Sequence, residues 1–322
     1  MITANNLHSP EHSIDAVVLA GKSNLIVQDK SNIRYSSFPI FPSCPSTLYH
    51  TKIVNPHEPM DKAGIDYKAI IPIDNKPMVS YVVEALAESD YVNNIYIVGE
   101  EDKLNKINFS RGKEKIRFVD DQGSFVDNLI EGGNKSKSKK ILYSTSDIPL
   151  ITNEDVNNFI RECSHREDSH FYLAYYLKED YEKSFSGAKS SRFYQFRGEK
   201  FVKNGYLFML DRGFLDDINK NKDMRNIIAF LYSGRKKRLW PYLKLAYKYP
   251  LFASLSLIIK YKRRTLAIDE AEKLLSRIIK YNIVAIKSSP EVGVDVDSYE
   301  ELQNIEKIIK KNKSYIKSEN IS

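Results

Sequence analysis

An aspartate that follows an apolar segment is the first candidate for chemistry in this sequence. Asp147 comes soon after the apolar run 140–144, and Pro149 would end that run in a turn. We therefore expect Asp147 at the end of a buried strand, where the edge of a parallel sheet faces a crevice. A carboxylate there suits magnesium, which takes one or two carboxylates together with waters and substrate phosphates. An aspartate that only caps a turn or a helix is the competing interpretation.

Two further aspartates lie near the C-terminal end of the chain. Asp295 and Asp297 alternate on an extended segment, so we expect both side chains on the same face. Two carboxylates on one face repel each other unless a cation lies between them, which again favours a metal site. The alternative is a turn that leads into a helix capped by Ser298, with Glu300 and Glu301 in its first turn. The residues alone do not decide which aspartate would bind the metal.

A glycine turn and a lysine supply the other candidate groups. Gly21 follows the apolar run 14–20 and would let a phosphate approach the backbone closely. This turn has neither a P-loop motif nor a dinucleotide-binding glycine motif, which disfavours P-loop kinases and Rossmann dehydrogenases. Lys68 opens the apolar segment 68–73 and could neutralise a triphosphate. By itself, however, a lysine in such a place is more often a solvated surface residue.

The first half of the chain alternates between strand patterns and helix patterns. Short apolar runs predict strands, and apolar residues three and four positions apart predict helices. The expected strands are 14–20, 68–73, 94–99, 115–119 and 140–144. The expected helices are 78–88, 124–131, which Gly132-Gly133 would end as a C-cap, and one that starts near Asn153. This alternation predicts an α/β fold with a mostly parallel, mixed central sheet and flanking helices.

The second half of the chain has a different rhythm. The expected elements are strands at 170–177, 192–196, 205–210 and 282–287, a helical C-terminal subdomain at about 212–280, and a final helix at 299–311. Residues 22–66 are polar and far longer than an ordinary loop of about 4–6 residues, so we interpret them as a flap, a disordered insertion or both. We therefore expect one domain over 14–311, with flexible termini at 1–13 and 312–322.

Five segments together carry a resemblance to a known family. They are AVVLAG (16–21), KAIIPIDNKPMVSYVVEAL (68–86), NIYIVG (94–99), LYSTSDIPLIT (142–152) and VDVDSYEEL (294–302). In this order they resemble the MobA-like NTP transferases, which are nucleotidyltransferases with a Rossmann-like GT-A fold. The resemblance implies an enzyme that joins an NTP to a phosphorylated acceptor, such as a sugar, a polyol or a cofactor precursor, and releases pyrophosphate.

The resemblance also implies roles for individual residues. Lys68 and Asp147 would be catalytic, and Asp147 would hold Mg²⁺ together with Asp295 or Asp297. Phosphoryl-type transfer needs positioning and charge neutralisation more than a protein nucleophile, so no catalytic Ser, Cys or His is required. The residues implied to bind the nucleotide are Leu19, Ala20, Gly21, Lys22, Lys68 and Ser146. The residues implied to contact the acceptor are Asn204 and Gly205, with Lys203 and Arg192 as candidates for binding an acceptor phosphate.

The sequence departs from the family pattern after its first strand. The family has a second glycine and an arginine in this loop, whereas Gly21 is followed here by Lys22-Ser23-Asn24. The segment 22–66 then intervenes before Lys68, and Tyr67 stands where the family has proline. These departures keep open a catalytically inactive relative that binds a nucleotide or a sugar phosphate. A GT-A glycosyltransferase that uses a nucleotide sugar is a further alternative, although such enzymes place a D-x-D motif on the nucleotide strand.

Composition limits the setting in which the protein works. Lysines and arginines number 49 against 42 aspartates and glutamates, and the resulting net charge of +7 suits an anionic ligand. The two cysteines, Cys44 and Cys163, form neither a disulfide framework nor a zinc site, so we expect a reduced, cytoplasmic setting. The N-terminus has no signal-peptide pattern, and no uninterrupted run of about 18 apolar residues predicts a transmembrane helix.

Residues 235–264 combine basic clusters at both ends with aromatic and aliphatic residues between them. One interpretation is a helical subdomain packed on the sheet, with solvated basic ends, and this is the interpretation we favour. The other is a peripheral contact with an anionic membrane. Binding of nucleic acid is not expected, because the basic residues do not accompany a recognisable reading motif.

Overall fold

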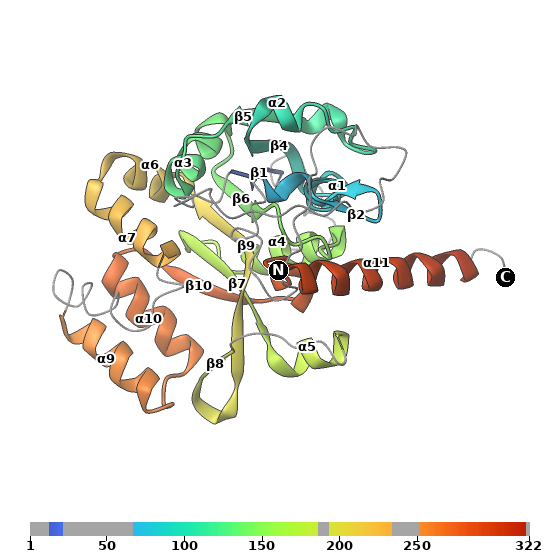
Figure 1. Cartoon of the computed structure of the whole chain (residues 1–322). Coiled ribbons are helices and arrows are strands. Elements are labelled where there is room, and N and C mark those ends of the chain that lie inside the picture. Colours follow the sequence, from blue (N-terminus) through green and yellow to red (C-terminus); the bar gives the residue numbers. More distant parts are fainter. Residues whose placement is uncertain (1–12, 22–66, 186–192, 234–250, 320–322) are drawn as a thin grey trace, which may run out of the picture.

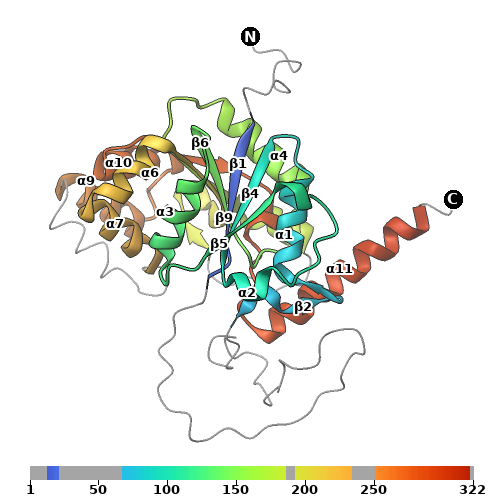
Figure 2. The same cartoon turned by 90° about the horizontal axis from the view of Figure 1, so that it is seen from above.

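The computed structural model describes residues 13–21, 67–185, 193–233 and 251–319. A twisted central sheet runs through the molecule, with helices on both of its faces (Figures 1 and 2). The apolar runs of the sequence form the buried strands, as in β1 (Ile14–Leu19), whose six residues are all buried. Within the described residues, no helix is long and apolar enough to cross a membrane.

The strand order of the main sheet is β10-β7-β9-β6-β1-β4-β5, with the short β8 paired to β9. Strands β6 and β7 pair antiparallel with β9, and the neighbouring pairs β1–β4, β1–β6, β4–β5 and β7–β10 are parallel. The mostly parallel, mixed sheet is therefore confirmed. The remaining strands are β4 (Val92–Gly99), β5 (Ile116–Asp120), β6 (Lys140–Thr145), β7 (Phe171–Leu177), β8 (Tyr194–Gln195), β9 (Phe201–Asp211) and β10 (Ile283–Lys287).

Two apolar cores lie on the two faces of this sheet. Helices α1 (Met78–Ala87) and α4 (Asn153–Ser164) contribute to one core, for example through Val82 and Phe159. Helix α3 (Phe125–Lys135) and the helical subdomain contribute to the other. The described helices of that subdomain are α6 (Arg212–Lys220), α7 (Lys222–Ser233), α9 (Leu251–Lys262) and α10 (Ile268–Ile279). The final helix, α11 (Tyr299–Glu319), continues past the expected end at residue 311.

The segment 68–73 does not form the expected strand. Residues Lys68–Ile70 form a 3₁₀ helix, closed by a hydrogen bond from Ile71 N to Lys68 O (3.0 Å). A small hairpin follows, made of β2 (Pro72–Ile73) and β3 (Lys76–Pro77). Asp74 and Asn75 both have positive φ angles, of 47° and 65°, as a two-residue hairpin turn of type I′ requires. The prediction was wrong because this stretch satisfies its backbone locally instead of joining the main sheet.

Helix α3 does not end at Gly132-Gly133, so the predicted C-cap was wrong. The helix continues to Lys135, and both glycines are buried in its last turns. A Cβ atom on Gly132 would lie 2.5 Å from Val17 Cγ1, and one on Gly133 would lie 2.2 Å from the hydroxyl of Tyr143. The glycines are therefore present because they let α3 approach the sheet closely, rather than because they break the helix.

Substituting Gly133 by alanine is expected to destabilise the protein by about 1–3 kcal/mol, the usual cost of overpacking a filled core. The added methyl group would collide with Tyr143 and with Leu215, whose Cδ2 would lie at 2.4 Å. The matched control is Gly213→Ala, because this glycine is also helical but a Cβ atom there would come no closer than 3.1 Å to Asp211 Oδ1. Urea unfolding of the two variants measures the difference, and equal free energies of unfolding would contradict this interpretation.

The order in which strands are added to the sheet reverses at β1. Strands β4 and β5 follow β1 on one side, whereas β6 returns to its other side. In an open α/β sheet, ligands bind outside the carboxyl ends of the strands at such a switch point. The expected crevice therefore lies where β1 ends near Gly21 and β6 ends near Asp147.

Candidate functional site

The turns that follow β1 and β6 are neighbours. The backbone N–H of Ala20 donates to Val98 O (2.8 Å), and that of Ser146 donates to Leu19 O (3.3 Å). These bonds extend the sheet hydrogen bonding beyond the ends of the strands. They bring together Leu19, Ala20, Gly21 and Ser146, which were predicted to bind the nucleotide, while Lys22 lies outside the described residues.

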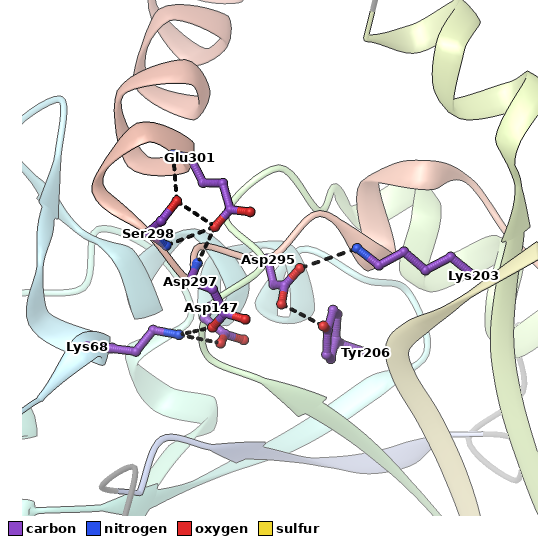
Figure 3. Close-up of polar contacts among 8 residues, drawn as sticks. All are labelled: Lys68, Asp147, Lys203, Tyr206, Asp295, Asp297, Ser298 and Glu301. Atoms are coloured by element: carbon purple, nitrogen blue, oxygen red, sulfur yellow. Dashed lines mark hydrogen bonds and ion pairs between the residues drawn. The ribbon is translucent and has the colours of Figure 1, made fainter. Parts of the chain in front are cut away.

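Lys68 links two of the predicted aspartates (Figure 3). Its Nζ atom lies 3.2 Å from Asp147 Oδ2 and 2.7 Å from Asp297 Oδ1. The three residues come from the 3₁₀ helix, from the turn after β6 and from the segment before α11. A hydrogen bond from Val296 N to Asp147 O (3.0 Å) ties the last two segments together. The fold thus gathers residues that are far apart in the sequence into one cluster.

The lysine of this cluster stays charged at neutral pH. Burial alone would lower the pKa of Lys68, but the negative charges of Asp147 and Asp297 outweigh it and hold that pKa above its usual value. The side chain of Lys68 is only 17% exposed, whereas that of Asp297 is 67% exposed. One positive charge therefore lies between two carboxylates beside the carboxyl ends of β1 and β6.

Asp147 has one oxygen that no described residue satisfies. Its Oδ1 atom is buried and accepts no hydrogen bond within the described part of the chain, whereas its Oδ2 atom contacts Lys68. A buried polar atom without a partner is costly, and a hard cation would satisfy it. Asp147 and Asp297 can share one cation, because both contact the same lysine nitrogen. The described residues contain no cluster of three or more potential metal ligands, but Mg²⁺ needs only one or two carboxylates when phosphates supply the rest.

Asp295 belongs to a second contact group. Its Oδ2 atom accepts a hydrogen bond from the Tyr206 hydroxyl (2.5 Å), and its Oδ1 atom lies 3.6 Å from Lys203 Nζ. Burial raises the pKa of Asp295 to about 6, while Lys203 opposes this shift and the nearby Asp297 and Asp147 add to it. Asp295 and Asp297 therefore contact different lysines, although their charges still act on each other (Figure 3).

The helix after these aspartates has its own cap. The backbone N–H groups of Asp297 and Ser298 both donate to Glu301 Oε2, each over 2.8 Å, and Glu301 N donates to Ser298 Oγ (3.3 Å). Ser298 and Glu301 thus cap α11 through a reciprocal arrangement. The Oδ1 atom of Asp297 accepts a hydrogen bond from Lys68 Nζ (2.7 Å).

The residues predicted to contact the acceptor, Asn204 and Gly205, lie inside β9. Gly205 is buried, and a Cβ atom there would lie 2.9 Å from Ala174 Cβ and from Val292 Cγ2, so its smallness serves packing. Asn204 is exposed on the same strand, directly after Lys203. Arg192 lies outside the described residues.

Sequence reasoning missed two supports of the site. Tyr67 is buried, accepts a hydrogen bond from Glu100 N (3.1 Å) and packs so closely on Gly99 that a Cβ atom there would lie 2.2 Å from its hydroxyl. Tyr67 directly precedes Lys68, so this packing helps to fix the position of Lys68. The signal in the sequence was the place of Tyr67, where the family has proline.

The second missed support lies beside Gly21. Asn128 donates to Asp121 Oδ1 (2.9 Å), and a Cβ atom on Gly21 would lie 2.4 Å from the Asn128 amide nitrogen. Asp121 follows β5 at the same edge of the sheet as Asp147, which is the signal that could have identified it.

With this geometry established, the family can be assigned. Residues 61–256 match the MobA-like NTP transferase domain, which is more than half of the chain. The chain belongs to the MobA-like NTP transferase family. The match begins just before Lys68 and includes Asp147, whereas β1, Asp295 and Asp297 lie outside it. Among curated proteins, no relative matches this chain.

Solved structures of nucleotidyltransferases share the fold. A hypothetical transferase from Thermus thermophilus is 23% identical, with a TM-score of 0.62 over 90% of this chain and 99% of that one. A CMP:2-keto-3-deoxy-manno-octonic acid synthetase complexed with CTP is 13% identical, with a TM-score of 0.50 over 93% of this chain and 99% of that one. At these identities the likeness concerns the fold, and it confirms the expected nucleotidyltransferase architecture.

Proposed function

We propose that this MobA-like NTP transferase is an active, Mg²⁺-dependent enzyme that moves a nucleotidyl group from an NTP to a phosphorylated acceptor and releases pyrophosphate. The observation that carries the proposal is the cluster of Lys68, Asp147 and Asp297 at the switch point of the sheet. A charged lysine between two carboxylates supplies what phosphoryl-type transfer needs, which is positioning and neutralisation of charge.

Asp147 and Asp297 would hold the metal. The buried, unpaired Oδ1 atom of Asp147 supports this assignment, as does the exposed carboxylate of Asp297 beside it. When bound, Mg²⁺ would neutralise charge on the phosphates of the nucleotide. Asp295 is a weaker candidate, because Lys203 and Tyr206 already occupy its two oxygens.

Lys68 would exchange its partners when a nucleotide binds. In this structure its charge is balanced by Asp147 and Asp297. With a nucleotide bound, Asp147 and Asp297 would hold the cation, and the ammonium group of Lys68 would pair with the phosphate oxygens. The backbone of Leu19–Gly21 and the side chains of Asp121 and Asn128 would then form the wall against which the nucleoside lies.

The acceptor would bind on the side of β9. Lys203 projects from this strand towards Asp295, and its ammonium group is partly buried, with 18% of the side chain exposed. An acceptor phosphate would gain a charge-assisted hydrogen bond from Lys203. Asp295 would hold Lys203 in position, supported by its hydrogen bond from Tyr206, while the exposed Asn204 supplies a polar group on the same strand.

Substituting Lys203 by methionine is therefore expected to raise KM for the acceptor by roughly tenfold or more, with little change in KM for the NTP, because one charged hydrogen bond is worth about 1.5–3 kcal/mol. Steady-state kinetics with each substrate varied in turn measures both constants. The control is Lys287→Met, because Lys287 also pairs with an aspartate, Asp180 (3.0 Å), but takes no part in the proposed site. Equal increases in both KM values would contradict the assignment of Lys203 to the acceptor.

The function itself is tested by a panel of NTPs with Mg²⁺ and a series of phosphorylated sugars, polyols and cofactor precursors, read by release of pyrophosphate. The proposal predicts release that requires one NTP, one acceptor and the metal. The alternative is a non-catalytic relative that binds a nucleotide or sugar phosphate, which the altered loop after Gly21 favours. A thermal shift with an NTP but no turnover with any acceptor would support that alternative.

A further inference from the structure

All six large apolar side chains that are exposed within the described residues lie on two neighbouring elements. Helix α9 carries Phe252, Leu255, Ile259 and Tyr261, and the β8–β9 hairpin carries Tyr194 and Phe201. The most exposed of them is Phe252, with 88% of its surface accessible. Single exposed apolar residues are ordinary on protein surfaces, but their gathering on one part of the molecule indicates an interaction site.

The exposed residues of α9 follow the spacing of one helix face. Phe252, Leu255 and Ile259 are three and four positions apart, so they form a stripe along the helix. The opposite face packs into the core through Ala253 and Leu257, alongside Leu274 and Ile278 of α10. The helix is therefore held in place on its inner side, while its outer stripe is directed towards solvent.

The β8–β9 hairpin packs beside the C-terminal part of α9. The ring of Tyr194 contacts the ring of Tyr261 edge-on, with centroids 6.3 Å apart. The backbone N–H of Arg197 donates to Leu266 O (2.8 Å), just beyond the end of α9. Both elements lie at the lower end of the molecule in Figure 1. They form one region, which we call the α9 surface.

Positive charges accompany the apolar side chains on the α9 surface. The exposed basic residues are Arg197 and Lys200 on the hairpin and Lys262, Arg263 and Arg264 at the end of the helix. Helix α9 itself contains no aspartate or glutamate. Lys260 is paired with Glu270 of α10 and is not counted among these charges.

We propose that the α9 surface docks this enzyme onto an anionic membrane surface. An apolar stripe flanked by lysines and arginines is the arrangement that inserts between lipid headgroups while pairing with their negative charges. A second copy of the chain fits less well, because five cations on each copy would face one another. Nucleic acid would attract the cations but would not favour contact with an aliphatic stripe. The attachment is peripheral, because α9 lies along the surface and its inner face is packed in the core.

The test is flotation of the full chain with vesicles of phosphatidylcholine alone and of phosphatidylcholine mixed with phosphatidylglycerol. The protein is expected to float only with the anionic vesicles, and less at high salt. Replacing Lys262, Arg263 and Arg264 by glutamine is expected to weaken binding roughly a hundredfold, because each cation near such a surface contributes about 1 kcal/mol. The apolar variant Phe252→Ser/Leu255→Ser/Ile259→Ser is also expected to lose binding while the cations remain.

A charge-matched control separates this site from the general positive charge of the protein. Lys106, Lys113 and Arg117 are exposed residues elsewhere, and replacing them by glutamine removes the same number of positive charges. This variant is expected to bind vesicles like the wild type. Circular dichroism melting shows whether each variant is folded. If the apolar variant is unfolded, the vesicle binding of the cation variant alone decides the test. The proposal would be overturned if the wild type did not bind vesicles, or if the control variant lost as much vesicle binding as the cation variant. It would also be overturned if the protein were a dimer that dissociated only in the apolar variant.

Discussion

Asp147→Asn is expected to lower the rate of pyrophosphate release by about a hundredfold to a thousandfold, the usual effect of removing one preorganised electrostatic contact with the transition state. Asparagine keeps the shape of the side chain but removes its negative charge, part of which lies on the buried Oδ1 atom. The metal would lose one of its two proposed carboxylates, and Lys68 would keep only Asp297 as a partner. The variant is therefore expected to bind an NTP with a smaller Mg²⁺-dependent thermal shift.

A matched aspartate shows whether this loss is specific. Asp180 pairs with Lys287 over 3.0 Å and has 27% of its side chain exposed, against 21% for Asp147, but it lies outside the proposed site. Asp180→Asn is expected to retain its activity. An Asp147→Asn enzyme with the activity of the wild type would remove Asp147 from the mechanism and, with it, the metal assignment.

Lys68→Met is expected to separate catalysis from metal binding. Pyrophosphate release should fall by about a hundredfold or more, because the variant lacks the ammonium group that we propose to contact the phosphates. Binding of Mg²⁺ in the absence of nucleotide should instead become tighter, by about tenfold, because the competing ammonium group no longer lies between Asp147 and Asp297. Without metal, the two carboxylates repel each other, so the variant is expected to melt at a lower temperature, and added Mg²⁺ is expected to restore the loss.

Lys76→Met is the control for this experiment. Lys76 pairs with Glu84 over 2.5 Å and lies over the ring of Tyr81, so it stabilises the β2–β3 hairpin against α1. Its removal is expected to lower the melting temperature without a gain in Mg²⁺ affinity, and activity should remain. If Mg²⁺ raised the melting temperatures of Lys68→Met and Lys76→Met equally, the ammonium group of Lys68 would not occupy the proposed Mg²⁺ site.

Much of the fold could be predicted because its strands are short apolar runs. The run 14–20 became β1, the run 140–144 became β6, and the family motifs placed Lys68 and Asp147 on one site before any geometry was available. The glycines of α3 were wrongly predicted to end the helix. A local rule for helix ends cannot show that Tyr143 of β6 and Leu215 of α6 pack against this helix. Tertiary packing decided the outcome there.

The different contact partners of Asp295 and Asp297 could not be predicted for a related reason. Their alternation indicates one face only if the segment is a regular strand, whereas residues 294–297 form an irregular link between a 3₁₀ helix and α11. The partners that separate them, Lys203 with Tyr206 and Lys68, come from other parts of the chain. Tyr67 was likewise visible only as a departure from the family motif, because its partner Glu100 lies after β4.

The proposed metal site is tested most directly by a crystal structure of the protein soaked with Mn²⁺ and the NTP that gives the largest thermal shift. Mn²⁺ replaces Mg²⁺ at such oxygen sites and is located by its anomalous scattering. The proposed mechanism predicts an anomalous peak within coordination distance of both Asp147 and Asp297, with the triphosphate beside it and Lys68 Nζ moved from the carboxylates to the phosphate oxygens. A bound NTP whose metal lies away from Asp147, or a Lys68 that keeps both of its carboxylate contacts, would contradict the account.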